Sequence, residues 1–328
     1  MTDPGIIPQF EDAQRTACKA SIMIEGLPGK GKSGAALGIA QILAGNEWEK
    51  VGVIDTENKS TPLFVGINNT FGNSFGQFKV AHLTPDMGFK PSNYLHLRDY
   101  AINKLNCSVV IKDSISHAWT YKGGVLDLVN QAKNSNTRYA KDSYAAWGDP
   151  EVYREKNELN QLIRDSRAHI ITTVRVKEKF EYDTSGEKTQ LKSLGEQQIQ
   201  QSELKYEPDL VLHMIEPGKC KKDKPPRHPV ARVIKSRYAI FDEGEEYDLT
   251  PELIQQLKDY LEEGIDPNEI LEKQRLDYIE VAKEHLKNNS SAKPIWKAIK
   301  KDAGYEETKL ENLPLEVIKS LYIKLTSN

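Results

Sequence analysis

The sequence predicts an α/β protein with a mostly parallel sheet flanked by helices, followed by a small all-α C-terminal domain. The first observation is that short runs rich in β-branched residues alternate with longer segments whose apolar residues recur at helical spacing. Such alternation is typical of strand-helix-strand units, in which the strands run parallel. The second observation is that only helical patterns follow residue 264. We therefore expect two domains, residues 1–264 and 265–328.

Each expected element depends on a local pattern. The apolar, β-branched runs that we expect to form strands cover residues 20–25, 50–55, 107–112, 168–174, 208–215 and 230–234. The segments with helical spacing in the first domain cover residues 33–44, 92–105, 123–132, 151–165 and 248–264. In the last of these, Thr250 precedes Pro251 as a helix N-cap and Gly264 is the stop. The second domain has helical patterns at about 267–287, 292–303 and 314–326.

Composition limits the classes of protein that the chain can belong to. Its 328 residues, 38% of them hydrophobic, are enough to bury a full core. We see no apolar run long enough to cross a bilayer and no signal-peptide pattern at the start, so we expect a cytoplasmic protein without a membrane partner. The net charge of −3 offers no general attraction for nucleic acid, and contacts of that kind must come from local patches.

Residues 26–33, "GLPGKGKS", fit the phosphate-binding pattern G-x-x-x-x-G-K-[ST] between an expected strand and an expected helix. Glycines allow the backbone N–H groups to turn toward phosphate oxygens, and the helix N-terminus adds partial positive charge. We expect Lys32 to reach the β- and γ-phosphates of ATP and the Ser33 hydroxyl to hold Mg²⁺. The predicted nucleotide-binding residues are Gly26, Leu27, Pro28, Gly29, Lys30, Gly31, Lys32, Ser33 and Gly34.

Two strand ends supply the acidic residues that nucleotide hydrolysis needs. Asp113 ends an apolar strand and is placed to hold the Mg²⁺ shell. The next residue is Ser114, which is not a carboxylate, so the group that activates water must come from elsewhere. Asp55 and Glu57 follow the strand after the phosphate-binding helix, and Glu57 is the candidate base.

These motifs carry a resemblance to a known family. A phosphate-binding loop, a strand ending in D-x-E, a strand ending in Asp-Ser, then "HIITTVRVK" and later "VIKSR" is the order found in RecA-type recombinase cores. The segments "AWGDPEVYREKNELNQLIRDSRAHIITTVRVKEKFEYD" and "LKYEPDLVLHMI" are similar to phage-encoded ATPases of the Sak-type single-strand annealing group. The similarity covers roughly residues 18–263 and implies a RecA-like P-loop NTPase core.

The resemblance also implies roles for individual residues. It makes Glu57 the water-activating carboxylate, Asp113 the magnesium-site acid and Thr173 a sensor that relays nucleotide state to a DNA-binding loop. Lys235 and Arg237 match a basic pair that reaches the γ-phosphate of the neighbouring subunit. The alternative for this pair, without the resemblance, is that two exposed basic residues at a strand edge deter aggregation.

The expected DNA-binding loop covers residues 177–198, a long glycine-punctuated segment between two strands. Aromatic side chains stack on bases while lysines follow the phosphates, the combination found in single-strand binders. A mobile surface loop without a ligand is the alternative. The predicted DNA-binding residues are Arg175, Lys177, Lys179, Phe180, Tyr182, Lys188 and Lys192.

We expect an ATP-hydrolysing, DNA-binding protein of phage-type recombination or single-strand annealing. Its expected partners are single-stranded DNA, further copies of itself in a filament or ring, and a single-strand binding protein, in the host cytoplasm if the chain is phage-encoded. A nucleotide-dependent scaffold or helicase-loader-like protein is an alternative. A nucleotide kinase is less favoured, because no arginine-rich lid for a second phosphate is evident.

Overall fold

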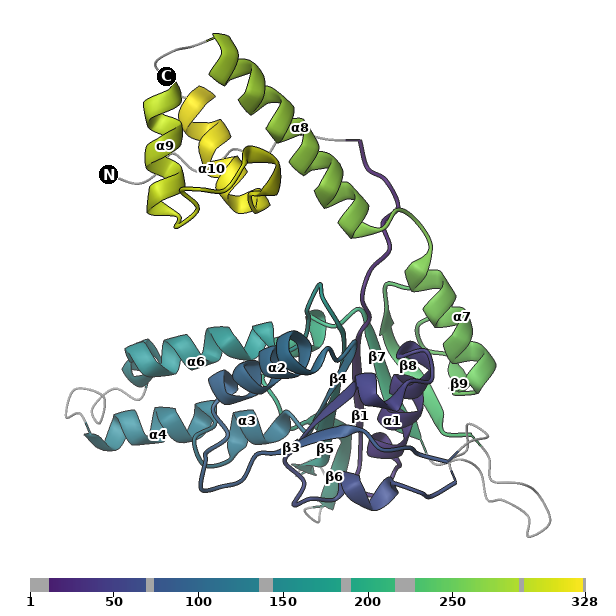
Figure 1. The fold of residues 1–328 in the computed structure, drawn as a ribbon. Helices are drawn as coiled ribbons and strands as arrows, with labels where there is room; N and C mark the ends of the chain where they lie inside the picture. The colour runs from purple at the N-terminus through teal and green to yellow at the C-terminus, as the bar shows by residue number, and fades with distance from the viewer. Residues whose placement is uncertain are drawn as a thin grey trace. The chain divides into compact units, whose positions relative to one another are not determined.

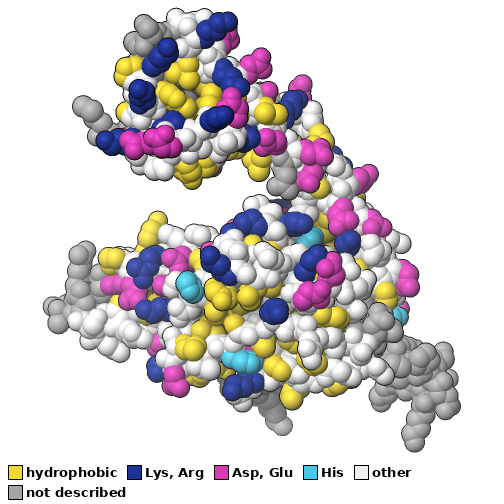
Figure 2. Space-filling view, in the orientation of Figure 1, with side chains coloured by type: hydrophobic (Ala, Val, Ile, Leu, Met, Phe, Trp, Pro, Cys, Tyr) yellow, Lys and Arg dark blue, Asp and Glu magenta, His cyan; other side chains and the backbone are white. Residues whose placement is uncertain are grey.

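The computed structural model describes residues 12–68, 74–135, 144–183, 190–215, 228–288 and 292–326. Within these ranges, only the backbone is described for residues 178–183, 190–196, 268, 292 and 321–326. The chain divides into two compact units, one of residues 19–261 and one of residues 1–18 with 262–328. Figure 2 shows basic and acidic side chains interspersed over the visible face of each unit.

The first unit is built around one twisted sheet (Figure 1). The strand order is β3 (Lys79–His82), β2 (Val51–Asp55), β4 (Val109–Asp113), β5 (His169–Asp183), β1 (Ser21–Gly26), β7 (Leu210–Ile215), β8 (Val230–Ser236) and β9 (Glu246–Asp248). The pairs from β3 to β7 are parallel, whereas β8 and β9 are added antiparallel. The predicted α/β fold, with a mostly parallel sheet flanked by helices, is confirmed.

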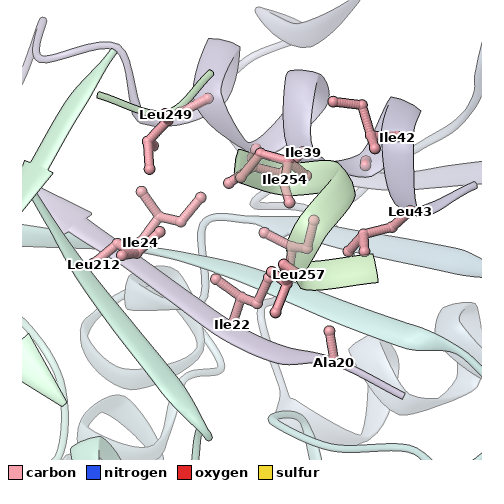
Figure 3. Close-up of a cluster of buried hydrophobic side chains, with 14 of the residues drawn as sticks. Ala20, Ile22, Ile24, Ile39, Ile42, Leu43, Leu212, Leu249, Ile254 and Leu257 are labelled. Atoms are coloured by element: carbon pink, nitrogen blue, oxygen red, sulfur yellow. The ribbon is translucent and has the colours of Figure 1, made fainter. Parts of the chain in front are cut away.

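Helices cover both faces of the sheet, and the alternation of side chains along β1 decides which face each residue serves. Ile22 and Ile24 pack with α1 (Lys32–Leu43) and α7 (Pro251–Glu262), as Figure 3 shows. Met23 points the other way, into the cluster beneath α2 (Pro91–Leu105) and α6 (Pro150–Gln161). The short helix α3 (Ser116–Thr120) and α4 (Val125–Ser135) complete that second layer. Both faces of β1 are therefore buried, as its continuous apolar sequence requires.

The prediction of a loop over residues 177–198 was wrong, because the described residues of this segment form β-strands. Strand β5 continues to Asp183, and β6 (Gln190–Gln198) pairs with it antiparallel, so the described residues of this segment form the two arms of a hairpin. Its alternating charged, polar and aromatic residues include no apolar run of the kind used to predict the other strands. Strands β3 and β9 were also missed because they are short edge segments with few apolar residues.

Lys112 departs from the apolar pattern of β4, and the structure shows where its charged side chain goes. The residue is 0% exposed, and its Nζ donates a hydrogen bond of 2.7 Å to the carbonyl oxygen of Leu162. Burial, together with the smaller effect of the nearby Arg98 charge, holds the pKa of Lys112 well below its usual value. Because successive strand residues face opposite ways, Lys112 points away from the side that Asp113 serves.

Replacing Lys112 with Met should make stability less dependent on pH. The pKa of Lys112 falls on folding, so the unfolded wild-type chain binds a proton that the folded chain does not. The free energy of unfolding therefore decreases as pH drops below about 10.4, by up to about 1.4 kcal/mol per pH unit, until the folded-state pKa is reached. Urea unfolding at pH 9 and pH 7 measures this slope.

We expect a shallower slope in Lys112→Met than in the wild type. The control is Lys104→Met, which removes an exposed lysine of α2 and should keep the wild-type slope. Equal slopes in all three proteins would show that Lys112 stays protonated on folding. The absolute difference at one pH is less informative, because the Met variant also loses the hydrogen bond to Leu162.

Among the described residues of the second unit, those after Asp266 form helices joined by turns. The unit contains α8 (Pro267–Asn288), α9 (Ala292–Asp302), the short helix η5 (Leu310–Asn312) and α10 (Leu315–Thr326). Its small core includes the buried side chains of Ile279, Ile299 and Ile318. The grouping of residues 1–18 with this unit was not predicted, and Thr16 forms a bridge with Ile265. None of the helices described in either unit combines the length and apolar character needed to cross a membrane.

Candidate active site

The phosphate-binding loop joins β1 to α1 in a conformation that needs its glycines. Gly29 and Gly31 have φ angles of 79° and 81°, the left-handed region that side chains with a Cβ disfavour. A Cβ at either position would meet no atom within 4 Å, so the requirement is conformational and not steric. Helix α1 begins at Lys32 directly after Gly31, so its first N–H groups face the loop. The sequence motif therefore has the strand-loop-helix setting that phosphate binding requires.

A hollow of about 610 Å³ lies over this loop, and we call it the nucleotide hollow. On the loop side it is lined by Pro28, Gly29, Gly31, Lys32, Ser33 and Gly34. Asp113 at the end of β4, Glu57 just after β2 and Arg175 within β5 line it from the neighbouring strands. The predicted residues Gly26, Leu27 and Lys30 are not among its lining residues, although the first two contact Lys32.

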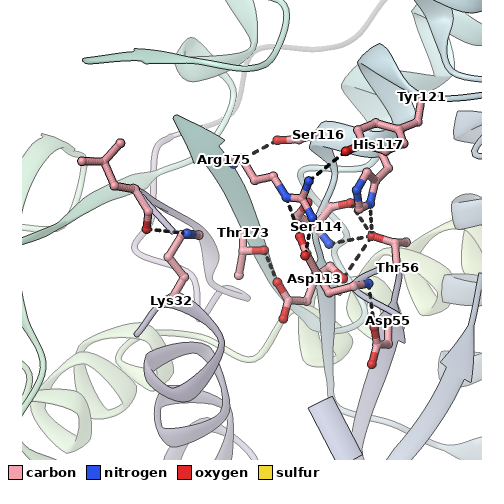
Figure 4. Close-up of polar contacts among 12 residues, drawn as sticks. Lys32, Asp55, Thr56, Asp113, Ser114, Ser116, His117, Tyr121, Thr173 and Arg175 are labelled. Carbon is pink, nitrogen blue, oxygen red and sulfur yellow. Dashed lines mark hydrogen bonds and ion pairs between the residues drawn. The ribbon is translucent and has the colours of Figure 1, made fainter. Parts of the chain in front are cut away.

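The side chain of Lys32 is held against its own loop. Its Nζ donates hydrogen bonds to the carbonyl oxygens of Gly26 and Leu27, at 2.9 and 3.0 Å. Figure 4 shows this side chain on one side of Thr173 and Asp113, with Arg175 and His117 on the other. The contacts fix the ammonium group beside the hollow, from which it can exchange carbonyl oxygens for phosphate oxygens.

Asp113 and Thr173 meet because β4 and β5 are neighbours in the sheet. The Thr173 hydroxyl donates a hydrogen bond of 2.5 Å to Oδ1 of Asp113. Asp113 is only 2% exposed, and burial raises the pKa of its carboxyl group. The other oxygen, Oδ2, is buried without a hydrogen-bond partner in the described part of the chain. The Ser33 hydroxyl lines the same hollow as Asp113, and Mg²⁺ takes oxygen ligands, so these two residues fit the metal.

Glu57 is paired with Arg175, which lies 118 residues later in the chain. The Arg175 Nε donates to Oε1 of Glu57 at 2.8 Å, and its terminal nitrogen donates to Oε2. Burial acts to raise the pKa of Glu57, but the hydrogen bond and charge of Arg175 outweigh it and leave the pKa below its usual range. Glu57 is therefore ionised at neutral pH, with both oxygens occupied by the guanidinium group.

Asp55 has a different task from Glu57, although both follow β2. One Asp55 oxygen accepts a hydrogen bond from the backbone N–H of Glu57 at 2.7 Å. The other accepts from the backbone N–H and the hydroxyl of Thr61, at 3.0 and 2.7 Å. Asp55 thus braces the turn that presents Glu57, and its oxygens are not available to activate water. Of the two predicted carboxylates, Glu57 is the one that lines the nucleotide hollow.

A family model described as an AAA domain matches residues 18–248, which is more than half of the chain and includes every residue of the nucleotide hollow. The chain belongs to the AAA domain family. Membership indicates an ATPase-type P-loop domain that binds and hydrolyses nucleotides, usually with Mg²⁺. No curated protein matches the chain.

Sequence reasoning missed a polar cluster beside Glu57 in this AAA domain. The Thr56 hydroxyl oxygen lies 2.6 Å from Nδ1 of His117 and accepts a hydrogen bond from the Ser114 N–H. Burial lowers the pKa of His117 to about 4, so the ring is neutral at pH 7. The only sequence signal was the position of His117 four residues after Asp113, which is too general to single out a functional histidine.

Two predicted residues of the AAA domain lie at the opposite edge of the sheet from the phosphate-binding loop. Because β8 is antiparallel to β7, its end at Ser236 pairs with Leu210, the first residue of β7. The Lys235 Nζ donates to the carbonyl oxygens of Tyr206 and Pro208, at 2.5 and 2.6 Å. Arg237 pairs with Asp209 at 2.8 Å. A chain does not bring these residues into its own nucleotide hollow, and a role in a neighbour's hollow stays a prediction.

The predicted DNA-binding residues fall into three groups. Arg175 lies in the nucleotide hollow, as described above. Lys177 follows it on β5 and is exposed. The remaining five side chains lie outside the described residues, namely those of Lys179, Phe180, Tyr182, Lys188 and Lys192.

Proposed function

We propose that this AAA domain is an ATPase coupled to single-stranded DNA, acting as an oligomer in phage-type DNA recombination or strand annealing. One observation carries the ATPase part: Lys32, Asp113 and Glu57 line a single hollow over the phosphate-binding loop. Lys32 binds the phosphates, Asp113 with Ser33 holds Mg²⁺, and Glu57 takes a proton from the attacking water. Mg²⁺ neutralises charge on the phosphate oxygens when bound.

Coupling to DNA is supported by the course of β5. The strand passes from Thr173 and Arg175 in the site directly into the β5–β6 hairpin, the segment that the resemblance assigns to DNA. A DNA strand bound to the hairpin would therefore act on Thr173 and Arg175, which contact Asp113 and Glu57. The proposal also includes a contact of Lys235 and Arg237 with the γ-phosphate in a neighbouring subunit. The nucleotide hollow of their own chain lies at the other edge of the sheet.

Single-turnover ATP hydrolysis, with and without a single-stranded oligodeoxythymidine, tests the proposal. Faster hydrolysis in the presence of the oligodeoxythymidine supports the proposal. A hydrolysis rate that DNA does not change would contradict the proposed coupling to DNA. Tight ATP binding without turnover favours the nucleotide-dependent scaffold. ATP consumption that requires a nucleoside monophosphate acceptor favours the kinase.

Replacing Lys177, Lys179, Lys188 and Lys192 with Ala should weaken single-strand binding and flatten its dependence on salt. Each phosphate contact that is lost removes the release of counterions, so four contacts change the slope of log K against log salt by up to about 3. Fluorescence anisotropy of a labelled oligomer across a salt series measures this slope.

A matched control changes the same number of charges elsewhere. Lys293, Lys297, Lys300 and Lys301 of α9 belong to a second basic segment, and replacing them with Ala should leave the slope unchanged. A slope that flattens in the α9 variant and not in the hairpin variant would move the DNA contacts to the second unit.

A further inference from the structure

A second hollow of about 320 Å³ adjoins the nucleotide hollow. Glu57 and Arg175 line both, so their ion pair forms a shared wall. The second hollow has an aromatic side made by Phe89, His117 and Tyr121, whose neighbouring ring centroids lie 4.2 to 6.1 Å apart. Its volume is at the lower end of the range for small-ligand sites. Nothing in the ATPase chemistry described above uses this space.

All three guanidinium nitrogens of Arg175 donate hydrogen bonds to residues that line the second hollow. Two nitrogens hold Glu57, and the third donates a hydrogen bond of 3.1 Å to the Tyr121 hydroxyl. The guanidinium carbon also lies 5.8 Å from the centre of the Tyr121 ring. Tyr121 is 46% exposed, so a ligand can reach the ring from solvent. A ligand in the second hollow therefore contacts Arg175, the side chain that forms the ion pair with Glu57.

The turn after Glu57 adds a second cation to this hollow. Asn58 and Lys59 are consecutive residues with φ angles of 55° and 62°, and both line the hollow. Left-handed backbone costs roughly 1 to 2 kcal/mol per residue with a side chain, and strain of this kind persists where the surroundings hold it. Here Asp55 holds the turn through Glu57 and Thr61. The second hollow therefore has an aromatic side and two cationic side chains, Lys59 and Arg175.

A planar ring attached to a phosphate matches this combination. Aromatic side chains stack on any nucleobase, and lysine and arginine bind the phosphate beside it. The guanidinium fork fits two phosphate oxygens as well as two carboxylate oxygens, so a phosphate can replace Glu57 as the partner of Arg175 without leaving either cation unpaired.

We infer that the second hollow takes one nucleotide unit of a single DNA strand, whose phosphate draws Arg175 away from Glu57. The ring lies against the exposed Tyr121, and the phosphate binds Arg175 and Lys59. Glu57 is then free to accept the proton of the attacking water in the nucleotide hollow. The inference deepens the proposed function and depends on it, because it makes strand binding the event that switches hydrolysis on.

Arg175→Gln tests the switch. Because the variant cannot hold Glu57 as an ion pair, its hydrolysis without DNA should rise roughly tenfold or more, the loss of one charge-assisted contact. Stimulation by an oligodeoxythymidine should fall to almost nothing. A wild-type basal rate with full stimulation would overturn the inference. So would a folded variant that binds ATP and hydrolyses none, because Arg175 would then act in the chemistry itself; thermal unfolding and ATP binding establish that it is folded.

Tyr121→Ala tests the ligand. Loss of one stacking face should raise the oligodeoxythymidine concentration needed for half-maximal stimulation by roughly tenfold. The control is Tyr153→Ala, which removes a 62% exposed tyrosine on α6 and should leave that concentration unchanged. An oligomer carrying 5-iododeoxyuridine should photo-cross-link to the peptide with His117 and Tyr121; cross-links confined to other peptides would overturn the assignment.

Two further outcomes separate the inference from the proposed function. Activation by free thymidine monophosphate as strong as by the oligomer would identify a small-molecule site and overturn the strand assignment. If DNA stimulates the wild type and both variants equally, the inference fails while the proposed function stands. If DNA neither binds nor stimulates the wild type, the proposed function fails and the inference fails with it.

Discussion

Glu57→Gln should bind ATP with nearly wild-type affinity and hydrolyse it at least about 100-fold more slowly. The amide keeps the size of the side chain but cannot accept the proton of the attacking water, and general-base catalysis contributes about 10² to 10⁴ in rate. The hydrogen bonds of Asp55 hold the turn that carries residue 57, so the backbone position of this residue does not depend on its charge. Single-turnover hydrolysis and equilibrium ATP binding measure the two effects separately.

The pH dependence gives a check on the same residue. In the absence of DNA, Arg175 keeps the pKa of Glu57 below its usual range, so the carboxylate is ionised from pH 6 to 8 and should not titrate there. Glu49→Gln, an exposed glutamate of the turn before β2, is the control and should hydrolyse ATP normally. Wild-type turnover in Glu57→Gln would place the base elsewhere. Loss of ATP binding would make Glu57 a structural residue.

Lys32→Ala should lower ATP affinity by roughly one to two orders of magnitude while the protein stays folded. A hydrogen bond to a charged group contributes about 1.5 to 3 kcal/mol, and a tenfold change in affinity is about 1.4 kcal/mol. The fold should persist because Lys32 is half-buried beside the hollow, and its Nζ donates to carbonyl oxygens of its own loop. Titration with a fluorescent ATP analogue measures the affinity, and thermal unfolding checks the fold.

Lys104→Ala is the matched control for Lys32→Ala. It removes an exposed lysine of α2 outside both hollows and should leave ATP affinity unchanged. Unchanged affinity in folded Lys32→Ala would refute the assignment of the loop to phosphate. A general loss of affinity in both variants would indicate an effect of net charge.

The phosphate-binding loop could be predicted because everything that it needs is contiguous. The strand, the two left-handed glycines, Lys32 and the helix start lie within one short stretch, and each follows from local chemistry. The proposed roles of Asp113 and Glu57 needed one further step. Parallel strands end at the same edge of a sheet, so the ends of β2 and β4 meet, and Asp55 pairs in register with Asp113.

The choice between Asp55 and Glu57 could be argued from the sequence only by resemblance. The structure provides a physical reason, because Asp55 uses both oxygens on the backbone of Glu57 and on Thr61. A side chain that braces its own turn and one that faces a ligand have the same sequence signature: a carboxylate after a buried strand. Only the path of the turn separates them.

The sequence by itself determined the α/β class, most strands and helices, and the nucleotide site, since periodicity and the phosphate motif act over short distances. The tertiary structure alone decided that Arg175 meets Glu57 and that Lys235 and Arg237 lie at the far edge. Both outcomes depend on strand order and register: β5 runs parallel beside β1 with Arg175 opposite Gly26, whereas β8 turns back antiparallel. Pairings between distant strands are set by packing of the whole sheet, which no local pattern records.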